Sequence, residues 1–123
     1  MTWKYVGNTN KDQRTNFATK YNSTFLSFGK SDSLKGAIKR LKELSPVEDN
    51  SKVNPKSPIS LNDENSLTEI LEISYRVRSN LDHGSKDLER ADSIGSRNRD
   101  LVEFAFKATF EILEWALISD RII

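Results

Sequence analysis

The only histidine in the chain, His83, follows two arginines, Arg76 and Arg78, in a segment whose apolar spacing is helical. An imidazole exchanges a proton near neutral pH, and a guanidinium is a permanent cation that binds phosphate or carboxylate groups well. On an ideal helix counted from Leu71, Arg78 falls at about −20°, within the apolar stripe, and Arg76 falls at about 140°, on the opposite face. A guanidinium on an apolar stripe is costly unless it is paired or opens into a polar cleft, so Arg78 requires an explanation and Arg76 does not.

Two interpretations of these residues stay open on spacing alone. Arg78 belongs to a functional cleft, or it forms a buried ion pair with Asp82 four residues later or with Asp100. His83 performs acid and base chemistry, or it is a residue near a helix C-terminus that the helix dipole favours.

The composition excludes several other kinds of site. The 123-residue chain has no Cys, which removes disulfides, thiolate metal sites and Cys nucleophiles, and a single His removes most zinc sites. Gly36 and Gly95 stand alone, so no Gly-rich phosphate loop is present, and no group of carboxylates has metal-binding spacing. We therefore expect neither a metal nor a cofactor.

The length predicts a single domain over residues 1–123, and the spacing of apolar residues predicts an all-α bundle. Helices are expected over about 13–28, 33–44, 66–84 and 98–118, with N-caps at Ser33, Ser66 and Asn98. The aromatic residues of the first recur at helical spacing and predict a core face: Phe17, Tyr21, Phe25 and Phe28. Ser66 with Glu69 predicts a capping box, and Gly84 marks the expected end of that helix. The three prolines fall within 46–65, which we expect to be a flexible, exposed loop. The chain has no signal segment and no apolar run long enough for a membrane, so we expect a cytoplasmic protein.

The charge is unevenly distributed along the chain. Residues 1–44 carry nine Lys or Arg and three Asp or Glu, a net +6, while the remainder has a net charge of −5. Such a basic half can hold a polyanion or face an acidic partner, or it is simply a solvated helix face. The densest basic surface, a candidate for substrate binding, consists of Lys35, Lys39, Arg40 and Lys42.

The last expected helix has more apolar surface than a helix on the outside of a monomer needs. Its polar positions share one strip about 80° wide, and nearly all of its other positions are apolar. Such a helix is either central in the fold or buried against a second subunit, and we expect a homodimer. The expected interface surrounds Phe104, Phe106, Phe110 and Trp115.

The run from Tyr75 to Gly84, which contains Arg78, Asn80 and His83, resembles the Arg-x4–6-His motif of HEPN domains and is most similar to their Apea-like branch. The resemblance covers about residues 66–118, because a charged stretch and a long apolar helix follow the motif. It implies a bundle of about four or five helices, usually dimeric and often a metal-independent endoribonuclease of toxins or anti-phage defence. In this family, Arg and His from two protomers line a shared cleft at the dimer interface.

The resemblance assigns Arg78 to phosphate stabilisation and His83 to proton transfer, with Asn80 orienting the phosphate or the imidazole. Cleavage by the RNA 2′-OH needs no metal, only proton transfer and a cation for the phosphorane oxygens, and it leaves a 2′,3′-cyclic phosphate. The family often has Asn, Asp or His directly after the Arg, where this chain has Ser79, a supporting candidate. Arg76 also fits the spacing and lies within about 20° of His83, so it is the alternative arginine.

RNA is the expected substrate, and the resemblance to toxins also implies an antitoxin or regulatory protein as a partner. Two other functions stay open. The chain is a non-catalytic HEPN module that binds a nucleotide, RNA or a partner protein, or it is a helical oligomerisation subunit in which Arg78 forms an interfacial ion pair.

Overall fold

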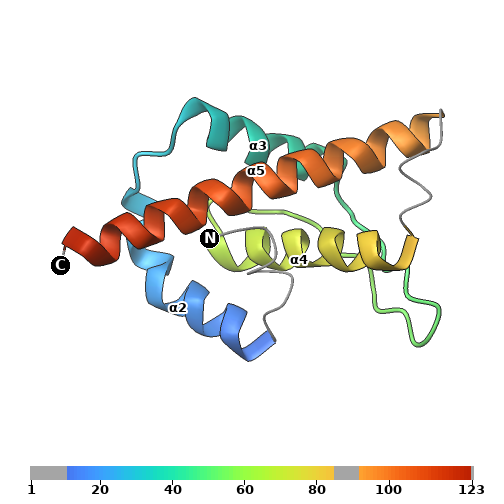
Figure 1. Cartoon of the computed structure of the whole chain (residues 1–123), viewed down its shortest axis with the longest axis horizontal. Helices are drawn as coiled ribbons and strands as arrows, with labels where there is room; N and C mark the ends of the chain where they lie inside the picture. Colours follow the sequence, from blue (N-terminus) through green and yellow to red (C-terminus); the bar gives the residue numbers. More distant parts are fainter. Residues whose placement is uncertain (1–10, 85–91, 123) are drawn as a thin grey trace.

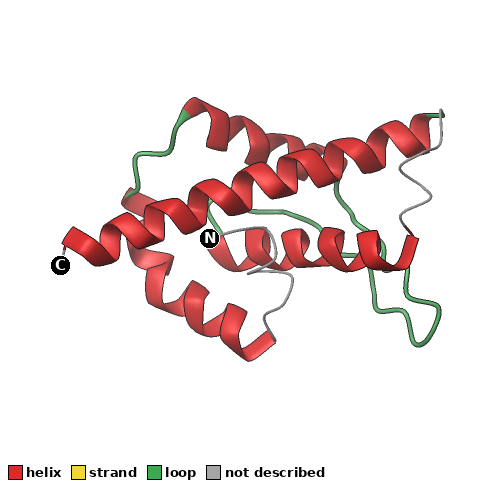
Figure 2. Ribbon diagram, viewed as in Figure 1, coloured by secondary structure: helices red, strands yellow, loops and turns green. Residues whose placement is uncertain are grey.

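A computed structural model of the chain describes residues 11–84 and 92–122, except for the side chains of residues 83, 84 and 120–122. Its helices are α2 (Lys11–Ser27), α3 (Asp32–Leu44), α4 (Leu67–Gly84) and α5 (Ser93–Ile122) (Figure 1). The described residues form no β-strand, which confirms the expected all-α class (Figure 2). None of the described helices is both long enough and apolar enough to cross a membrane.

α5 is the longest helix and runs across the whole molecule, with α3 on one side of it and α4 and α2 on the other (Figure 1). Its buried face carries mostly short side chains, Ala105, Ala108 and Ala116 beside Ile112. Short side chains let the neighbouring helices α3 and α4 approach closely and pack against this face. α5 therefore has the central position that its apolar surface allowed, although part of a second face stays exposed.

An aromatic cluster joins the end of α2 to the C-terminal half of α5. Tyr21 and Phe25 are buried, and each ring meets Trp115 edge-on, at centroid distances of 5.6 and 5.8 Å. Phe28 stacks on Trp115 at 4.6 Å. The aromatic spacing of the first expected helix thus marks core residues, and Trp115 packs inside the chain. Phe104 is also partly buried against the core, so only Phe106 and Phe110 of the expected interface are exposed.

A buried cation fixes α2 against α4. Arg14 is only 7 % exposed, and its Nε donates to the carboxylate of Glu72 at 3.1 Å. Its guanidinium also lies 3.6 Å from the centroid of the Tyr75 ring. Pairing and stacking together compensate the cost of removing this charge from water.

The first two connections use serine caps. Ser31, rather than the predicted Ser33, caps α3, because its Oγ accepts a hydrogen bond from Leu34 N at 3.0 Å. Ser66 caps α4 as predicted and accepts a hydrogen bond from Glu69 N at 3.2 Å. The Glu69 carboxylate binds backbone N–H groups of the preceding loop, so only this half of a capping box is observed.

The start of α5 differs more from the prediction. The helix begins at Ser93 and not near Asn98, because the Asp92 carboxylate accepts a hydrogen bond from Gly95 N at 3.0 Å. Asp is a strong N-cap residue, and this cap adds an earlier turn to the helix. The extra turn carries Arg97, which reaches the segment after α3.

That segment follows a defined path back to α4. Val47 and Leu61 are buried, and Val47 and Ile59 exchange two backbone hydrogen bonds, of 2.7 and 3.0 Å. Arg97 donates to the carbonyl oxygen of Pro46 at 2.7 Å. The predicted loop is exposed over most of its middle, but both of its arms are anchored to the helices.

Candidate functional site

Arg76 lies in the interior. This differs from the prediction, which placed Arg76 on the helix face opposite the apolar stripe, where a charged side chain requires no partner. It is 7 % exposed, and its Nη1 donates to the carbonyl oxygens of Val47 at 3.1 Å and Ser57 at 3.0 Å. The loop between α3 and α4 returns over this face of α4 and buries it. The guanidinium satisfies the carbonyl oxygen of Ser57 and gives that of Val47 a second hydrogen bond beside the one from Ile59 N–H, which is a structural role.

Asn80 holds the same loop one turn further along α4. Its Nδ2 donates to the carbonyl oxygen of Glu48 at 2.6 Å, and its Oδ1 accepts from the N–H of Asn50 at 2.9 Å. The Asp49 carboxylate then closes the loop by accepting from Lys56 N at 2.8 Å. The Asn80 amide, which was expected to orient a phosphate or an imidazole, therefore forms hydrogen bonds to the loop backbone through both its nitrogen and its oxygen.

Arg78 is the arginine of the motif that reaches the surface. Its side chain is 20 % exposed, and Nη1 donates to the carboxylate of Asp82 on the next turn. Its Nε is shielded from solvent and has no hydrogen-bond partner among the described residues. Of the two ion pairs considered from the sequence, the structure has the one with Asp82, because Asp100 pairs with Arg40 at 2.9 Å.

An apolar groove lies beside Arg78 between α4 and α5. Leu81, three residues after Arg78 and so on the same side of α4, lines it with Val102, Phe106 and Phe110. The cavity has a volume of ≈ 580 Å³, and the Phe106 and Phe110 rings stack at 6.3 Å while remaining 47 % and 43 % exposed. We call this surface the α4–α5 groove.

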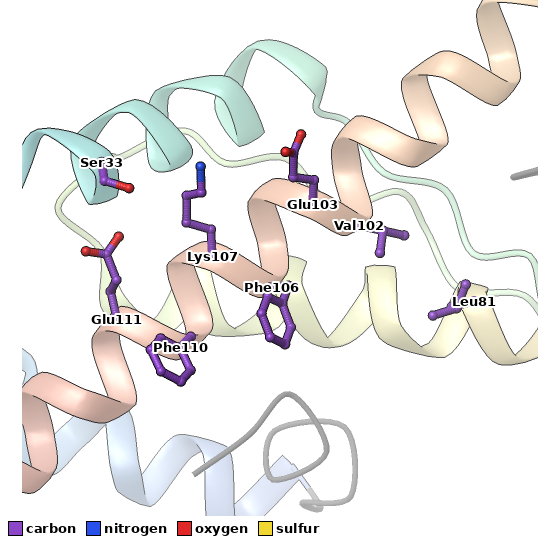
Figure 3. Close-up of a pocket in the computed structure, with 8 residues that line it drawn as sticks. All are labelled: Ser33, Leu81, Val102, Glu103, Phe106, Lys107, Phe110 and Glu111. Atoms are coloured by element: carbon purple, nitrogen blue, oxygen red, sulfur yellow. The ribbon is translucent and has the colours of Figure 1, made fainter.

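The polar residues of the α4–α5 groove lie on the side of α3. Figure 3 shows Phe106 and Phe110 pointing to one side of α5, whereas Lys107 and Glu111 project toward Ser33. This amphipathic division leaves the two rings as the apolar edge of the groove. The apolar spacing of the sequence includes both the two rings and Leu81, but it does not show that Leu81 of α4 lies opposite the rings of α5.

His83 belongs to the last turn of α4, and its side chain lies outside the described residues. Because α4 stays helical through Gly84, the directions of Arg78 and His83 differ by about 140° around its axis. On one copy of α4 the two positions therefore do not share a face. Ser79, which directly follows Arg78, is partly buried.

The basic surface predicted on the second helix is divided. Arg40 turns to Asp100, and Lys42 lies 3.8 Å from the carboxylate of Glu64. Lys35 and Lys39, in contrast, line a separate cavity together with Lys30. Lys30 was missed in the sequence because the α2–α3 connection, and not a helix stripe, brings it there.

No group of three or more His, Cys, Asp or Glu side chains with the geometry of a metal site occurs in the part of the chain that the structure describes. Comparisons with protein-family models, with curated proteins and with solved structures find no match to this chain.

Proposed function

We propose that the chain is a metal-independent endoribonuclease of the HEPN type that works as a homodimer. The observation that carries the proposal is the placement of Arg78 at the surface beside the α4–α5 groove, while Arg76 is held in the interior by loop carbonyls. We assign Arg78 to the scissile phosphate and His83 to the proton transfers. The resemblance to toxins and anti-phage defence proteins also implies an antitoxin or regulatory partner.

We infer that two chains share the site because the positions of Arg78 and His83 on α4 lie about 140° apart around the helix axis. A site that contains both groups is then built from Arg78 of one protomer and the histidine of the other. The α4–α5 groove is the surface proposed for this contact, because Phe106 and Phe110 are large exposed rings next to Leu81 on the Arg78 side of α4. The pairing also supplies two histidines to the assembly, although each chain has one.

In the proposed reaction, the imidazole of His83 takes the proton of the RNA 2′-OH, and the freed oxygen attacks the adjacent phosphorus. Arg78 stabilises the negative charge that develops on the nonbridging oxygens. The bond from phosphorus to the 5′ oxygen breaks, and an imidazolium returns a proton to the leaving oxygen. The products are a 2′,3′-cyclic phosphate and a 5′-OH end. In this scheme Asn80 positions the loop beside α4, and Ser79 supports the phosphate.

The test is cleavage of a single-stranded RNA by the purified protein in EDTA. His83→Ala and Arg78→Ala are each expected to lower the rate by about 10² or more, the usual contribution of a positioned acid or base. Lys52→Ala removes one charge from the exposed loop and is expected to cleave like the wild type. Cleavage that requires Mg²⁺ would overturn the proposal.

The outcome also separates the proposal from the binding alternatives. RNA that is bound but not cut, with an affinity unchanged in His83→Ala, would favour a non-catalytic binding module. A chain that sediments as a monomer at every concentration assayed would remove the shared site. Loss of dimerisation in Arg78→Ala without any RNA phenotype would favour an oligomerisation subunit.

A further inference from the structure

A second cavity, of ≈ 480 Å³, lies where the α2–α3 connection and α3 face the segment before α4. Its size is within the range of small-molecule sites. It is separate from the Arg78 region, because Asn65 in its lining precedes α4 and Arg78 lies about 17 Å along α4 from the first residue of that helix. The cavity is lined by Phe28, Gly29, Lys30, Lys35, Gly36, Ile38, Lys39, Glu64 and Asn65.

The charge in this cavity is mostly positive and unbalanced. Lys35 and Lys39 are exposed, lie four residues apart on α3 and make no ion pair among the described residues. Like charges at this helical spacing disfavour the helix, so the pair has a cost for folding. The one carboxylate in the lining, Glu64, lies 3.8 Å from the ammonium of Lys42. An anion between Lys35 and Lys39 would remove their repulsion.

Lys30 adds a third cation that is held in place. Its Nζ donates to the carbonyl oxygen of Phe25 at 3.0 Å and lies 4.3 Å from the centroid of the Phe25 ring. Burial, and secondarily the charge of Lys35, lowers the pKa of Lys30 from its ordinary value. A bound anion would offset both causes, because it would replace lost water and oppose the charge of Lys35.

The rest of the cavity suits a flat organic group. Phe28 supplies an apolar wall, and its ring stacks on Trp115 at 4.6 Å, whereas Ile38 is buried beneath the cavity with only 1 % of its surface exposed. Gly29 and Gly36 leave the cavity open, since a Cβ at either position would meet nothing within 4 Å. Aromatic and apolar walls beside convergent cations are typical of sites that bind a base or ring and its phosphate.

We propose that this cavity binds a phosphate ester of mononucleotide size, with Lys35 and Lys39 on the phosphate and Phe28 against the organic group. Lys30 completes the cationic side. The inference does not depend on the ribonuclease function, since it uses none of the Arg78 region. The phosphate can belong to a free nucleotide or to the 5′ end of an RNA, and the two sources are distinguished by experiment.

The experiment is calorimetric titration of the full chain at low salt with AMP, adenosine, a 5′-phosphorylated RNA hexamer and the same hexamer with a 5′-OH, both 2′-O-methylated so that the proposed ribonuclease cannot cut them. AMP is expected to bind and adenosine to bind at least tenfold more weakly. Lys35→Gln and Lys39→Gln are each expected to weaken AMP at least fivefold, while Lys11→Gln, an exposed lysine on α2, leaves it unchanged. A hexamer that binds only with its 5′-phosphate, without AMP binding, would support the site and identify nucleic-acid ends as the ligand.

Gly36→Glu provides a test that does not weaken the fold. The new side chain has open space at its base and would place a carboxylate among the lysines, so AMP binding is expected to be lost while Gly36→Ala retains it. AMP affinity that is unchanged in Gly36→Glu would overturn the proposal. It would also be overturned by equal weakening in Lys11→Gln and Lys35→Gln, which indicates nonspecific attraction, or by no binding of any phosphate probe. The AMP titration on Arg78→Ala is expected to match the wild type, because AMP is proposed to bind in the second cavity.

Discussion

Arg78 and Asp82 form an ion pair one helical turn apart on α4, with the guanidinium Nη1 donating to the carboxylate. The Asp82 side chain is 65 % exposed, so water screens the pair. Surface pairs at this spacing contribute about 0.3–0.5 kcal/mol to folding. The pair is therefore displaceable, and a phosphate that approaches Arg78 competes with Asp82 for the same donor.

Asp82→Asn is expected to strengthen RNA binding by about twofold to fivefold, because it removes the competing carboxylate and leaves Arg78 for the phosphate. Folding stability should change by less than about 0.5 kcal/mol. Fluorescence anisotropy with a labelled, uncleavable RNA measures the affinity, and Asp12→Asn on α2 controls for net charge. Equal affinity of Asp82→Asn and wild type would mean that Arg78 does not contact the phosphate.

Arg76→Met is expected to destabilise the fold by about 2–4 kcal/mol, since the carbonyl oxygens of Val47 and Ser57 lose their charged donor inside the protein. Arg78→Met should cost less than about 1 kcal/mol, because its carboxylate partner is exposed. Urea unfolding of the two variants measures the difference. Similar losses of stability in both would contradict the distinction between a structural and a surface arginine.

Phe106→Asp is expected to dissociate the proposed dimer without unfolding the chain. Phe106 is 47 % exposed and lines the α4–α5 groove, so a carboxylate there opposes association more than folding. Trp115→Ala, in contrast, should cost about 3–5 kcal/mol, because the ring packs against Tyr21, Phe25 and Phe28 within the chain. Sedimentation velocity over a range of concentrations checks the first effect. A Phe106→Asp dimer as stable as the wild type would show that α5 is not the interface.

Local patterns in the sequence predicted the parts of the fold that depend on near neighbours. The spacing of Tyr21 and Phe25 predicted a core face, and the helix ending at Gly84 was predicted from its glycine. The angle of Arg78 on its helix left open a polar cleft or an ion pair with Asp82 or Asp100, and the structure has the ion pair with Asp82. Each of these relationships lies within one or two helical turns, where ideal geometry is a sufficient guide.

The features that the sequence could not predict depend on contacts between distant segments. Arg76 is buried because the loop from Val47 to Ser57 returns over its face of α4, and no period in the sequence encodes that return. Lys30 joins Lys35 because a connection folds beside α3. The early start of α5 has a local cause instead. Asp92 is an N-cap residue, and the period of the apolar residues does not reveal an N-cap.

Lys30 predicts how ligand binding in the second cavity depends on pH. Its lowered pKa means that it loses its proton at a lower pH than an ordinary lysine, whose value is 10.5. A bound phosphate favours the charged form, so AMP affinity is expected to fall as the pH rises through the alkaline range toward 10.5. AMP does not contribute to this change, because its phosphate, with a second pKa of about 6, is already fully ionised above neutral pH.

Lys30→Met supplies the control, since Lys35, Lys39 and Glu64 face the same cavity and remain in the variant. Titration of AMP at several pH values from 7 upward should show a fall in affinity for the wild type that begins at a lower pH than in Lys30→Met. The difference between the two curves isolates the ammonium of Lys30 from the other charges. Curves that are parallel over the whole range would mean that Lys30 serves only to hold the end of α2 through Phe25.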